Sequence, residues 1–170
     1  GYPVVIKALG AELAHKSELG AVLVGLHSEA EVVAGVAAIA ESITGHGARS
    51  ERFLVERMVE GAVAELLVGV KRDPQFGPAL VIGTGGTLVE LLADTVALLL
   101  PTERQAVEAA VSSLKVSRLL DGFRGAPAGD RGAAIDAIVS VADFAADHWD
   151  TLVELDINPL MVLPAGGGVV

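Results

Sequence analysis

Residues 154–160, close to the end of the chain, read ELDINPL and carry the clearest structural signal in the sequence. Polar and apolar residues alternate here with the period of a β-strand, which places Glu154, Asp156 and Asn158 on one face. Acidic and amide side chains are poor strand formers, and carboxylates on one face repel each other. A hard cation such as Mg²⁺, bound by one or two carboxylates together with nucleotide phosphates, would resolve this conflict. The simpler alternative is a sheet face exposed to solvent. The stretch therefore predicts either a strand that binds a metal ion or a strand with one solvated face.

Outward from this stretch, the chain alternates strand-like runs with longer helical patterns. The runs expected to form strands span residues 3–9, 21–26, 52–59, 62–71, 78–82, 96–100, 151–158 and 160–163. A turn at residues 73–77 joins two of them as a hairpin, because Pro74 presets φ and Gly77 closes the turn. Strand pairs mixed with long helices predict an α/β or α+β fold.

Three helices are expected, each opened by a capping residue. Ser28 with Glu31, and Thr102 with Gln105, have the spacing of a capping box, and Asp130 can cap the third helix. A glycine-rich connection over residues 119–132 precedes that third helix. The expected apolar faces comprise Val32, Val36, Ile39 and Ile43 in the first helix, Val107, Ala110, Val111 and Leu114 in the second, and Ile135, Ile138, Val139, Ala142 and Trp149 in the third.

The composition argues against several classes of function. A formal net charge of −10 over 170 residues argues against a nucleic-acid partner, because phosphate backbones are bound by clustered Lys and Arg. The apolar blocks are all shorter than the ~18 residues of a membrane helix, so no membrane role is expected. The absence of Cys excludes thiolate metal sites and is consistent with a reducing cytoplasm. The chain opens on Gly1-Tyr2-Pro3 without an initiator Met and looks like a fragment.

Three features could bind an anion. Lys7 lies in an apolar strand, where its amine needs water or an anion; an edge-strand Lys that reaches solvent is the alternative. His15 and Lys16 lie in a polar turn, which is either a loop that closes over phosphates or an ordinary solvated turn. Gly85 and Gly86 belong to a glycine cluster whose backbone N–H groups could bind phosphate, although a hairpin exit explains them equally well.

Four blocks of the sequence together resemble a known family. They are PVVIKALGAELAHKSELGAVLVGL (residues 3–26), FLVERMVEGAVAELLVGVKRDPQFGPALVIGTGGTLVELLAD (53–94), LLDGFRGAP (119–127) and LVELDINPL (152–160). In this order they are similar to the ATP-grasp domain of ADP-forming acyl-CoA synthetases, of the acetate–CoA ligase type; succinyl-CoA synthetase is a more distant relative. The resemblance implies an ATP-grasp fold of two lobes, a smaller one at residues 1–52 that is incomplete and a larger one at residues 53–170 whose last strand is truncated.

The resemblance also assigns roles around the nucleotide phosphates. Lys7 would hold the phosphates, and Lys16 would approach them from a mobile loop. His15 in that loop would receive or pass on the phosphoryl group. Asp156 and Asn158 would be ligands of Mg²⁺.

At the other end of the nucleotide, the resemblance implies a hinge and a ribose contact. The backbone of the hinge at Met58 and Val59 would face the adenine together with Glu56, and Glu65 would hydrogen-bond the ribose. Lys7, Glu56, Glu65 and Asn158 would then line one cleft between the lobes. Most family members carry an Arg where this chain has Leu98, so Leu98 is expected to remove a cation that faces the phosphates.

The implied reaction is acid plus ATP plus CoA giving acyl-CoA, ADP and phosphate, with a phosphohistidine carried from a separate CoA-ligase domain or subunit. That partner, rather than this chain, would bind CoA and select the acid, and an oligomeric enzyme is compatible with the resemblance. The main alternative is a non-catalytic, synthetase-like regulatory domain of a protein-lysine acetyltransferase. A pure interaction domain with a vestigial pocket is a third reading.

Overall fold

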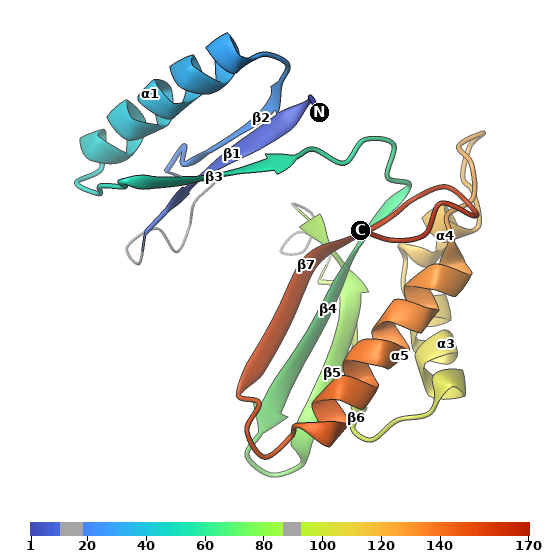
Figure 1. Cartoon of the computed structure of the whole chain (residues 1–170). Coiled ribbons are helices and arrows are strands. Elements are labelled where there is room, and N and C mark those ends of the chain that lie inside the picture. Colours follow the sequence, from blue (N-terminus) through green and yellow to red (C-terminus); the bar gives the residue numbers. More distant parts are fainter. Residues whose placement is uncertain (11–18, 87–92) are drawn as a thin grey trace. The chain divides into compact units, whose positions relative to one another are not determined.

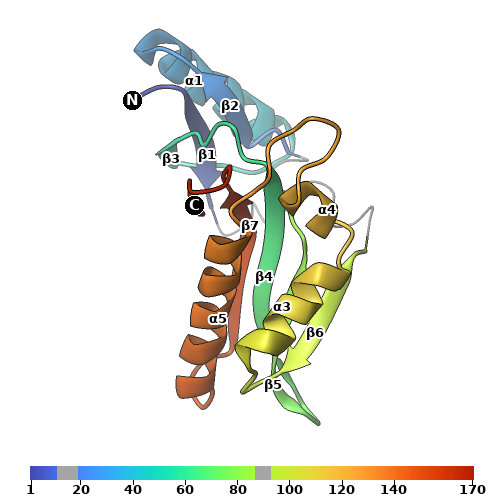
Figure 2. The ribbon, with the colours of Figure 1, turned by 90° about the vertical axis from the view of Figure 1, so that its right-hand side faces the viewer.

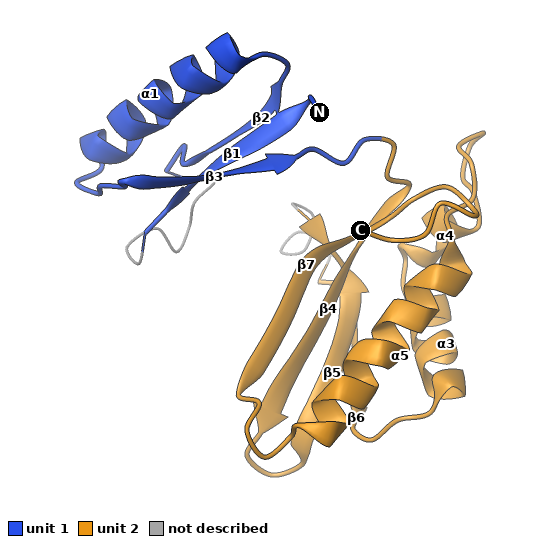
Figure 3. Ribbon diagram, in the orientation of Figure 1, with its two compact units in different colours: residues 1–60 blue, residues 61–170 orange. Residues whose placement is uncertain are grey.

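A computed structural model describes residues 1–10, 19–86 and 93–170. The chain divides into two compact units, Gly1–Glu60 and Gly61–Val170, coloured blue and orange in Figure 3. This division lies beyond the boundary that the sequence analysis expects at residue 52, because the strand that begins there pairs within the first unit. His15 and Lys16 lie outside the described residues, so their predicted roles stay predictions.

The first unit is a three-stranded antiparallel sheet with one helix on it (Figure 1). Its elements are β1 (Val4–Leu9), β2 (Val22–Leu26), α1 (Glu29–Gly45) and β3 (Arg52–Arg57), and the strand order is β2-β1-β3. The core forms where α1 covers the sheet: Ile6 and Ala8 of β1 are fully buried against Ile39 and Ile43 of the helix. Gly35 allows this close approach, because a Cβ there would lie 3.2 Å from the Ile6 side chain.

The start of α1 confirms the predicted cap. The Ser28 hydroxyl accepts the backbone N–H of Glu31 at 3.2 Å, and the Glu31 carboxylate accepts the N–H of His27 at 2.8 Å. The bond from His27 lowers the pKa of Glu31, because it stabilises the charged carboxylate. The Glu31 side chain therefore reaches back to the residue before the cap instead of to the cap itself.

The second unit is a four-stranded antiparallel sheet in the order β6-β5-β4-β7. Its strands are β4 (Ala64–Asp73), β5 (Gly77–Thr84), β6 (Thr95–Leu99) and β7 (Glu154–Val162), and its helices are α3 (Arg104–Ser113), α4 (Ser117–Leu120) and α5 (Arg131–Asp147). Helices α3 and α5 lie on the same face of the sheet (Figure 2), and the core fills the space between. Leu66, Val68 and Ile82 from the sheet are fully buried there, as are Val111 and Ile138 from the helices.

The face of this sheet away from the helices carries the polar residues. Along β4, Leu66, Val68 and Val70 are buried on the helix side, so the alternating Glu65 and Gly69 face the other way. The same alternation along β7 turns its acidic and amide residues away from the core. Both antiparallel sheets agree with the predicted α+β class and with an ATP-grasp architecture.

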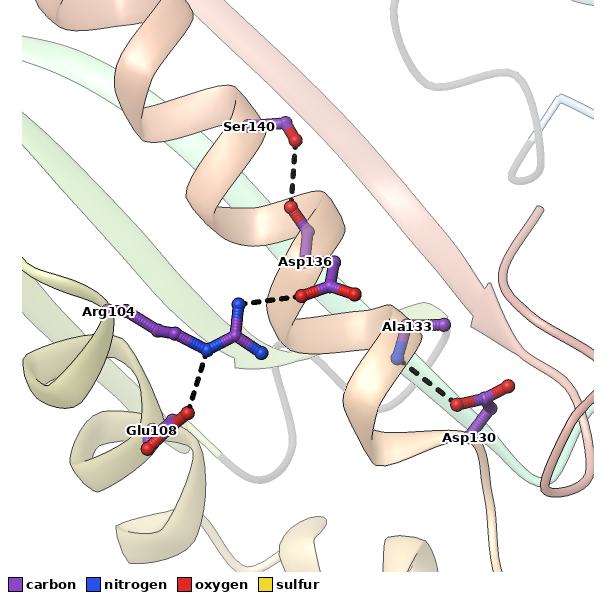
Figure 4. Close-up of polar contacts among 6 residues, drawn as sticks. All are labelled: Arg104, Glu108, Asp130, Ala133, Asp136 and Ser140. Carbon is purple, nitrogen blue, oxygen red and sulfur yellow. Dashed lines mark hydrogen bonds and ion pairs between the residues drawn. The ribbon is translucent and has the colours of Figure 1, made fainter.

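Polar contacts join α3 to α5 on the helix side, as Figure 4 shows. Arg104 of α3 donates to Glu108 at 2.9 Å and to Asp136 of α5 at 2.6 Å. The Asp136 carboxylate raises the pKa of Arg104 through this bond. Since these side chains are about half exposed and screened by water, the ion pairs contribute little to the stability of the fold.

Several local predictions are wrong. Glu103, not Thr102, is the N-cap of α3, and no side chain caps that helix, because the chain enters it one residue later than expected. Trp149 lies beyond α5 and is 55% exposed, so it is not part of the buried face. The two strands expected over residues 151–158 and 160–163 are one strand, β7 (Glu154–Val162), because pairing with β4 continues past Pro159. The connection expected from residue 119 begins inside α4.

Among the residues that the structure describes, no helix is both long and apolar enough to cross a membrane.

Candidate functional site

Lys7 and Glu56 form an ion pair on the sheet face of the first unit that points away from α1. Lys7 pairs with Leu54 and Glu56 pairs with Val5, so the two charged side chains are diagonal neighbours on adjacent strands. Their Nζ and Oε2 atoms lie 2.6 Å apart, and the Oε2 atom of Glu56 is itself shielded from solvent. Because both side chains are about 40% exposed, the pair contributes on the order of 0–1 kcal/mol. The Lys7 side chain is thus partly accessible to solvent on this open face of the sheet.

The expected hinge residues follow β3 directly. Met58 and Val59 are half-buried in the segment after Arg57. The Met58 N–H donates to the Pro3 carbonyl at 2.9 Å, which ties this segment to the start of β1. Of the two backbone polar groups of Met58, the carbonyl is thus the one that a ligand could use without breaking this bond.

The glycine cluster at the end of β5 is bonded to three different elements. The N–H of Thr84 donates to the Asp94 carbonyl at 3.0 Å, and the N–H of Gly85 donates to the Glu65 carbonyl at 2.8 Å. The N–H of Gly86 donates to the amide oxygen of Asn158 at 2.9 Å. These three N–H groups are thus bonded within the protein itself. A phosphate that bound the same N–H groups would have to replace these bonds.

Close packing against backbone requires Gly85, and a backbone conformation with positive φ favours glycine at Gly86. A Cβ on Gly85 would lie 2.5 Å from the backbone of Leu66, which leaves no room for any side chain. Gly86 has a φ of +68°, and a Cβ there would lie 1.7 Å from Oε2 of Glu65. The Glu65 carboxylate therefore rests directly against Gly86, beside a pocket of about 300 Å³ whose lining includes Glu65, Thr84 and Gly85.

Asp156 and Asn158 share the open face of β7, as predicted. Asp156 pairs with Gly69 of β4. Because glycine has no side chain, the space beside the Asp156 carboxylate is open on the β4 side, where a Cβ on Gly69 would lie 3.7 Å from the carboxylate. The described residues contain no group of three or more His, Cys, Asp or Glu that could hold a metal ion. The oxygen donors of Asp156 and Asn158 fit Mg²⁺ in kind, but a stable site would need further oxygens, as from nucleotide phosphates.

Leu98 does not lie where the sequence analysis expects it. It pairs with Leu80 in the sheet of the second unit and packs against the hydrophobic core. An apolar side chain is the ordinary choice for such a position. The expectation that Leu98 removes a cation facing the phosphates is therefore wrong for this chain.

The structure thus forms two clusters from the predicted residues. Lys7 and Glu56 meet in the first unit, while residues from three strands meet in the second: Glu65 of β4, Gly85 and Gly86 after β5, and Asn158 of β7. Sequence reasoning missed Asp94, whose carboxylate accepts from the Thr84 hydroxyl at 2.9 Å and from the Lys115 N–H at 2.8 Å. No local pattern signals it, since both partners lie far from it in the sequence.

Comparison with known proteins agrees with this geometry. Residues 1–170 match the ATP-grasp domain family. The chain is 38% identical over its full length to acetate–CoA ligase (ADP-forming) I of Archaeoglobus fulgidus, but it covers only 25% of that protein. It is 31% identical to the β subunit of acetate–CoA ligase (ADP-forming) II of Pyrococcus furiosus, again over its full length, and covers 72% of that subunit.

Solved structures give the same result. One match is the dinucleotide forming acetyl-coenzyme A synthetase 1 of Ca. Korarchaeum cryptofilum, solved in complex with coenzyme A and Mg-AMPPCP. The TM-score is 0.80 and the sequence identity is 34%, over 99% of this chain and 73% of that one. It matches PH1788 of Pyrococcus horikoshii with a TM-score of 0.86 and 31% identity, over all of this chain and 72% of that one. The first curated relatives are thus about four times as long as the chain. The chain belongs to the ATP-grasp domain family, of the kind found in ADP-forming acid–CoA ligases.

Proposed function

We propose that this chain is the ATP-binding part of an ADP-forming acyl-CoA synthetase, which converts an acid, ATP and CoA into acyl-CoA, ADP and phosphate. The observation that carries the proposal is the cluster of Glu65, Gly85, Gly86 and Asn158, brought together from three strands. Packing alone does not require a carboxylate and an amide beside two glycines at a sheet end. Two members of the cluster, Glu65 and Gly85, line the pocket of about 300 Å³, and a few polar groups that line a pocket are what orients a bound ligand.

In the first unit, Lys7 would bind nucleotide phosphate. Its ammonium is held by one half-exposed carboxylate, so a phosphate with more negative charge is a stronger partner. Glu56 would then be released to accept hydrogen bonds from the adenine, with the Met58 carbonyl and the Val59 backbone beside it. Catalysis here would rest on positioning and charge stabilisation, because phosphoryl transfer asks for little covalent chemistry from the protein.

In the second unit, Glu65 would bind the ribose hydroxyls, and Asp156 and Asn158 would hold Mg²⁺. Bound Mg²⁺ would neutralise charge that develops on the phosphates. Asp156 is already oriented to the open face, while Asn158 would have to share its amide oxygen with Gly86. His15 would receive or pass on the phosphoryl group and Lys16 would approach the phosphates; both lie outside the described residues.

The partner would be a CoA-ligase domain or subunit, which supplies the phosphohistidine and binds CoA. The relatives support this, since one matched protein is named as a β subunit and others are far longer than this chain. A cytoplasmic location and an oligomeric enzyme remain proposals from the composition and the resemblance. The regulatory alternative depended on Leu98, and the core position of Leu98 removes that argument.

The proposal is tested in the full-length protein by calorimetric titration with Mg-ATP and by assay of thioester formation from acetate, ATP and CoA. Lys7→Ala should abolish turnover and weaken Mg-ATP binding, because phosphate charge would lose its partner. Lys71→Ala is the matched control, since Lys71 is an exposed strand lysine in the second unit, and it should bind and turn over normally. Wild-type turnover by Lys7→Ala, or no nucleotide binding by the unmodified protein, would refute the proposal.

A further inference from the structure

The segment Thr84-Gly85-Gly86 is held by a different element at each of its three residues. Thr84 is bonded to Asp94 just before β6, Gly85 to Glu65 of β4, and Gly86 to Asn158 of β7. Two of these contacts involve residues proposed above to bind nucleotide. The third, at Asp94, involves a residue with no role in that proposal.

Asp94 makes the largest number of these bonds. Its carbonyl accepts the Thr84 N–H at 3.0 Å, and its carboxylate accepts the Thr84 hydroxyl at 2.9 Å. The same carboxylate oxygen accepts the Lys115 N–H at 2.8 Å, just after α3 ends. One aspartate thus joins the end of β5, the start of β6 and the segment after α3.

The surroundings make this joint rigid. Thr84 is only 5% exposed, so its hydroxyl has little access to water, and a buried hydroxyl without a partner is costly. Gly83 packs so closely on the other strand that a Cβ there would lie 2.7 Å from the Asp94 carbonyl. Neither strand can shift at this point without breaking bonds or creating overlap.

We infer that Asp94 is a positioning residue for the nucleotide site, and this inference rests on the function proposed above. Asp94 fixes Thr84, and Thr84 sets where Gly85 and Gly86 lie. Those glycines in turn locate Glu65, whose carboxylate rests against Gly86, and Asn158, whose amide accepts from it. Within the described part of the chain, Asp94 bonds to Thr84 and Lys115 and to no residue proposed to contact nucleotide, so it acts through the glycine segment.

The test uses the full-length protein and two pairs of substitutions. Asp94→Ala removes the acceptor, whereas Asp94→Asn retains an acceptor oxygen. Thr84→Val removes the hydroxyl at nearly constant shape, whereas Thr84→Ser retains it. A placement error of about 1 Å can cost about a hundredfold in rate. Because the same displacement moves the groups that bind nucleotide, we expect Asp94→Ala and Thr84→Val to raise the Kd of Mg-ATP about tenfold or more. Asp94→Asn and Thr84→Ser should stay close to wild type, and the KM for CoA should be unchanged throughout.

Asp73→Ala is the matched control. Asp73 lies at the opposite end of the β4–β5 hairpin and accepts the N–H groups of Gln75 and Phe76 at 2.8 and 2.9 Å. Its loss should lower stability without changing the Kd of Mg-ATP. Equal weakening by Asp73→Ala, or wild-type affinity in both Asp94→Ala and Thr84→Val, would overturn the inference. Should Asp94→Ala not fold, Thr84→Val decides alone. Failure of the wild-type protein to bind Mg-ATP would instead refute the proposed function.

Discussion

The backbone N–H of Gly86 donates to the Oδ1 atom of Asn158 at 2.9 Å, although the two residues are 72 positions apart. This bond joins the glycine cluster to the strand that the sequence marks as a metal-binding candidate. Two features that appear independent in the sequence are therefore parts of one structure. A ligand that engages either residue would alter the position of the other.

Asn158→Ala should weaken Mg-ATP binding by about tenfold, because it removes both the acceptor for Gly86 and a proposed metal ligand. Asn158→Asp keeps an acceptor oxygen for the N–H group and should retain most of the affinity. Calorimetric titration of both variants in the full-length protein measures the difference. Equal loss in the two variants would show that the bond to Gly86 does not matter for binding.

Gly86→Ala should weaken nucleotide binding, because the new Cβ would displace the Glu65 carboxylate from its place. Gly77→Ala is the control, since Gly77 also has a positive φ, +84°, but a Cβ there would meet no other atom within 4 Å. Both changes should lower the free energy of unfolding by about 1–2 kcal/mol through backbone strain. Only Gly86→Ala should raise the Kd of Mg-ATP. Chemical denaturation and calorimetry together separate the two effects, and an unchanged Kd in Gly86→Ala would remove Glu65 from the site.

Asp156→Asn should reduce the gain in ATP affinity that Mg²⁺ provides, while the affinity for ATP without metal stays nearly the same. The reason is that a neutral amide is a weaker ligand for a hard cation than a carboxylate. Glu154→Gln is the control on the same exposed face of β7 and should leave the Mg²⁺ dependence unchanged. The measurement is a titration of ATP at several Mg²⁺ concentrations. If both variants lose the same amount, the effect is general surface charge and not a metal ligand.

Local patterns predicted most of the elements because their causes are local. The alternation along residues 154–160 and the caps at Ser28 and Asp130 depend on neighbours within a few positions, and the structure confirms them. The ATP-grasp fold followed from the resemblance, which spans nearly the whole chain. Asp94 could not be found in this way, because both of its partners come from other elements.

The errors have the same origin. Leu98 was assigned from a residue type in the family, whereas its direction depends on strand register against Leu80. Trp149 fits the helical period, but α5 ends at Asp147, so the period no longer applies to it. Its carbonyl instead accepts from Arg72, whose guanidinium also lies 5.8 Å from the Trp149 ring. Register and helix length depend on distant contacts, which a pattern over neighbouring residues does not contain.

Asp130 links the start of α5 to the end of the chain. Its Oδ1 atom accepts the Ala133 N–H at 3.1 Å, the contact drawn in Figure 4, and its Oδ2 atom accepts the N–H groups of Gly166 and Gly168 at 3.1 and 3.0 Å. These bonds lower the pKa of Asp130 below its ordinary value of 3.8, because each stabilises the charged carboxylate. The bond from Ala133 has the largest effect.

Since the pKa is lower in the folded chain than in the unfolded one, the charged form of Asp130 stabilises the fold at neutral pH. This contribution is complete above pH 3.8 and is lost as the pH falls through the lower folded value. Asp130→Asn should therefore melt at a lower temperature than wild type at pH 7, and the gap should narrow below pH 3.8. Asp143→Asn, an exposed carboxylate on the same helix, should show little gap at any pH. Thermal denaturation from pH 7 to pH 3 tests this, and a gap for Asp130→Asn that stays constant over that range would mean that the carboxylate stabilises the fold by shape and not by charge.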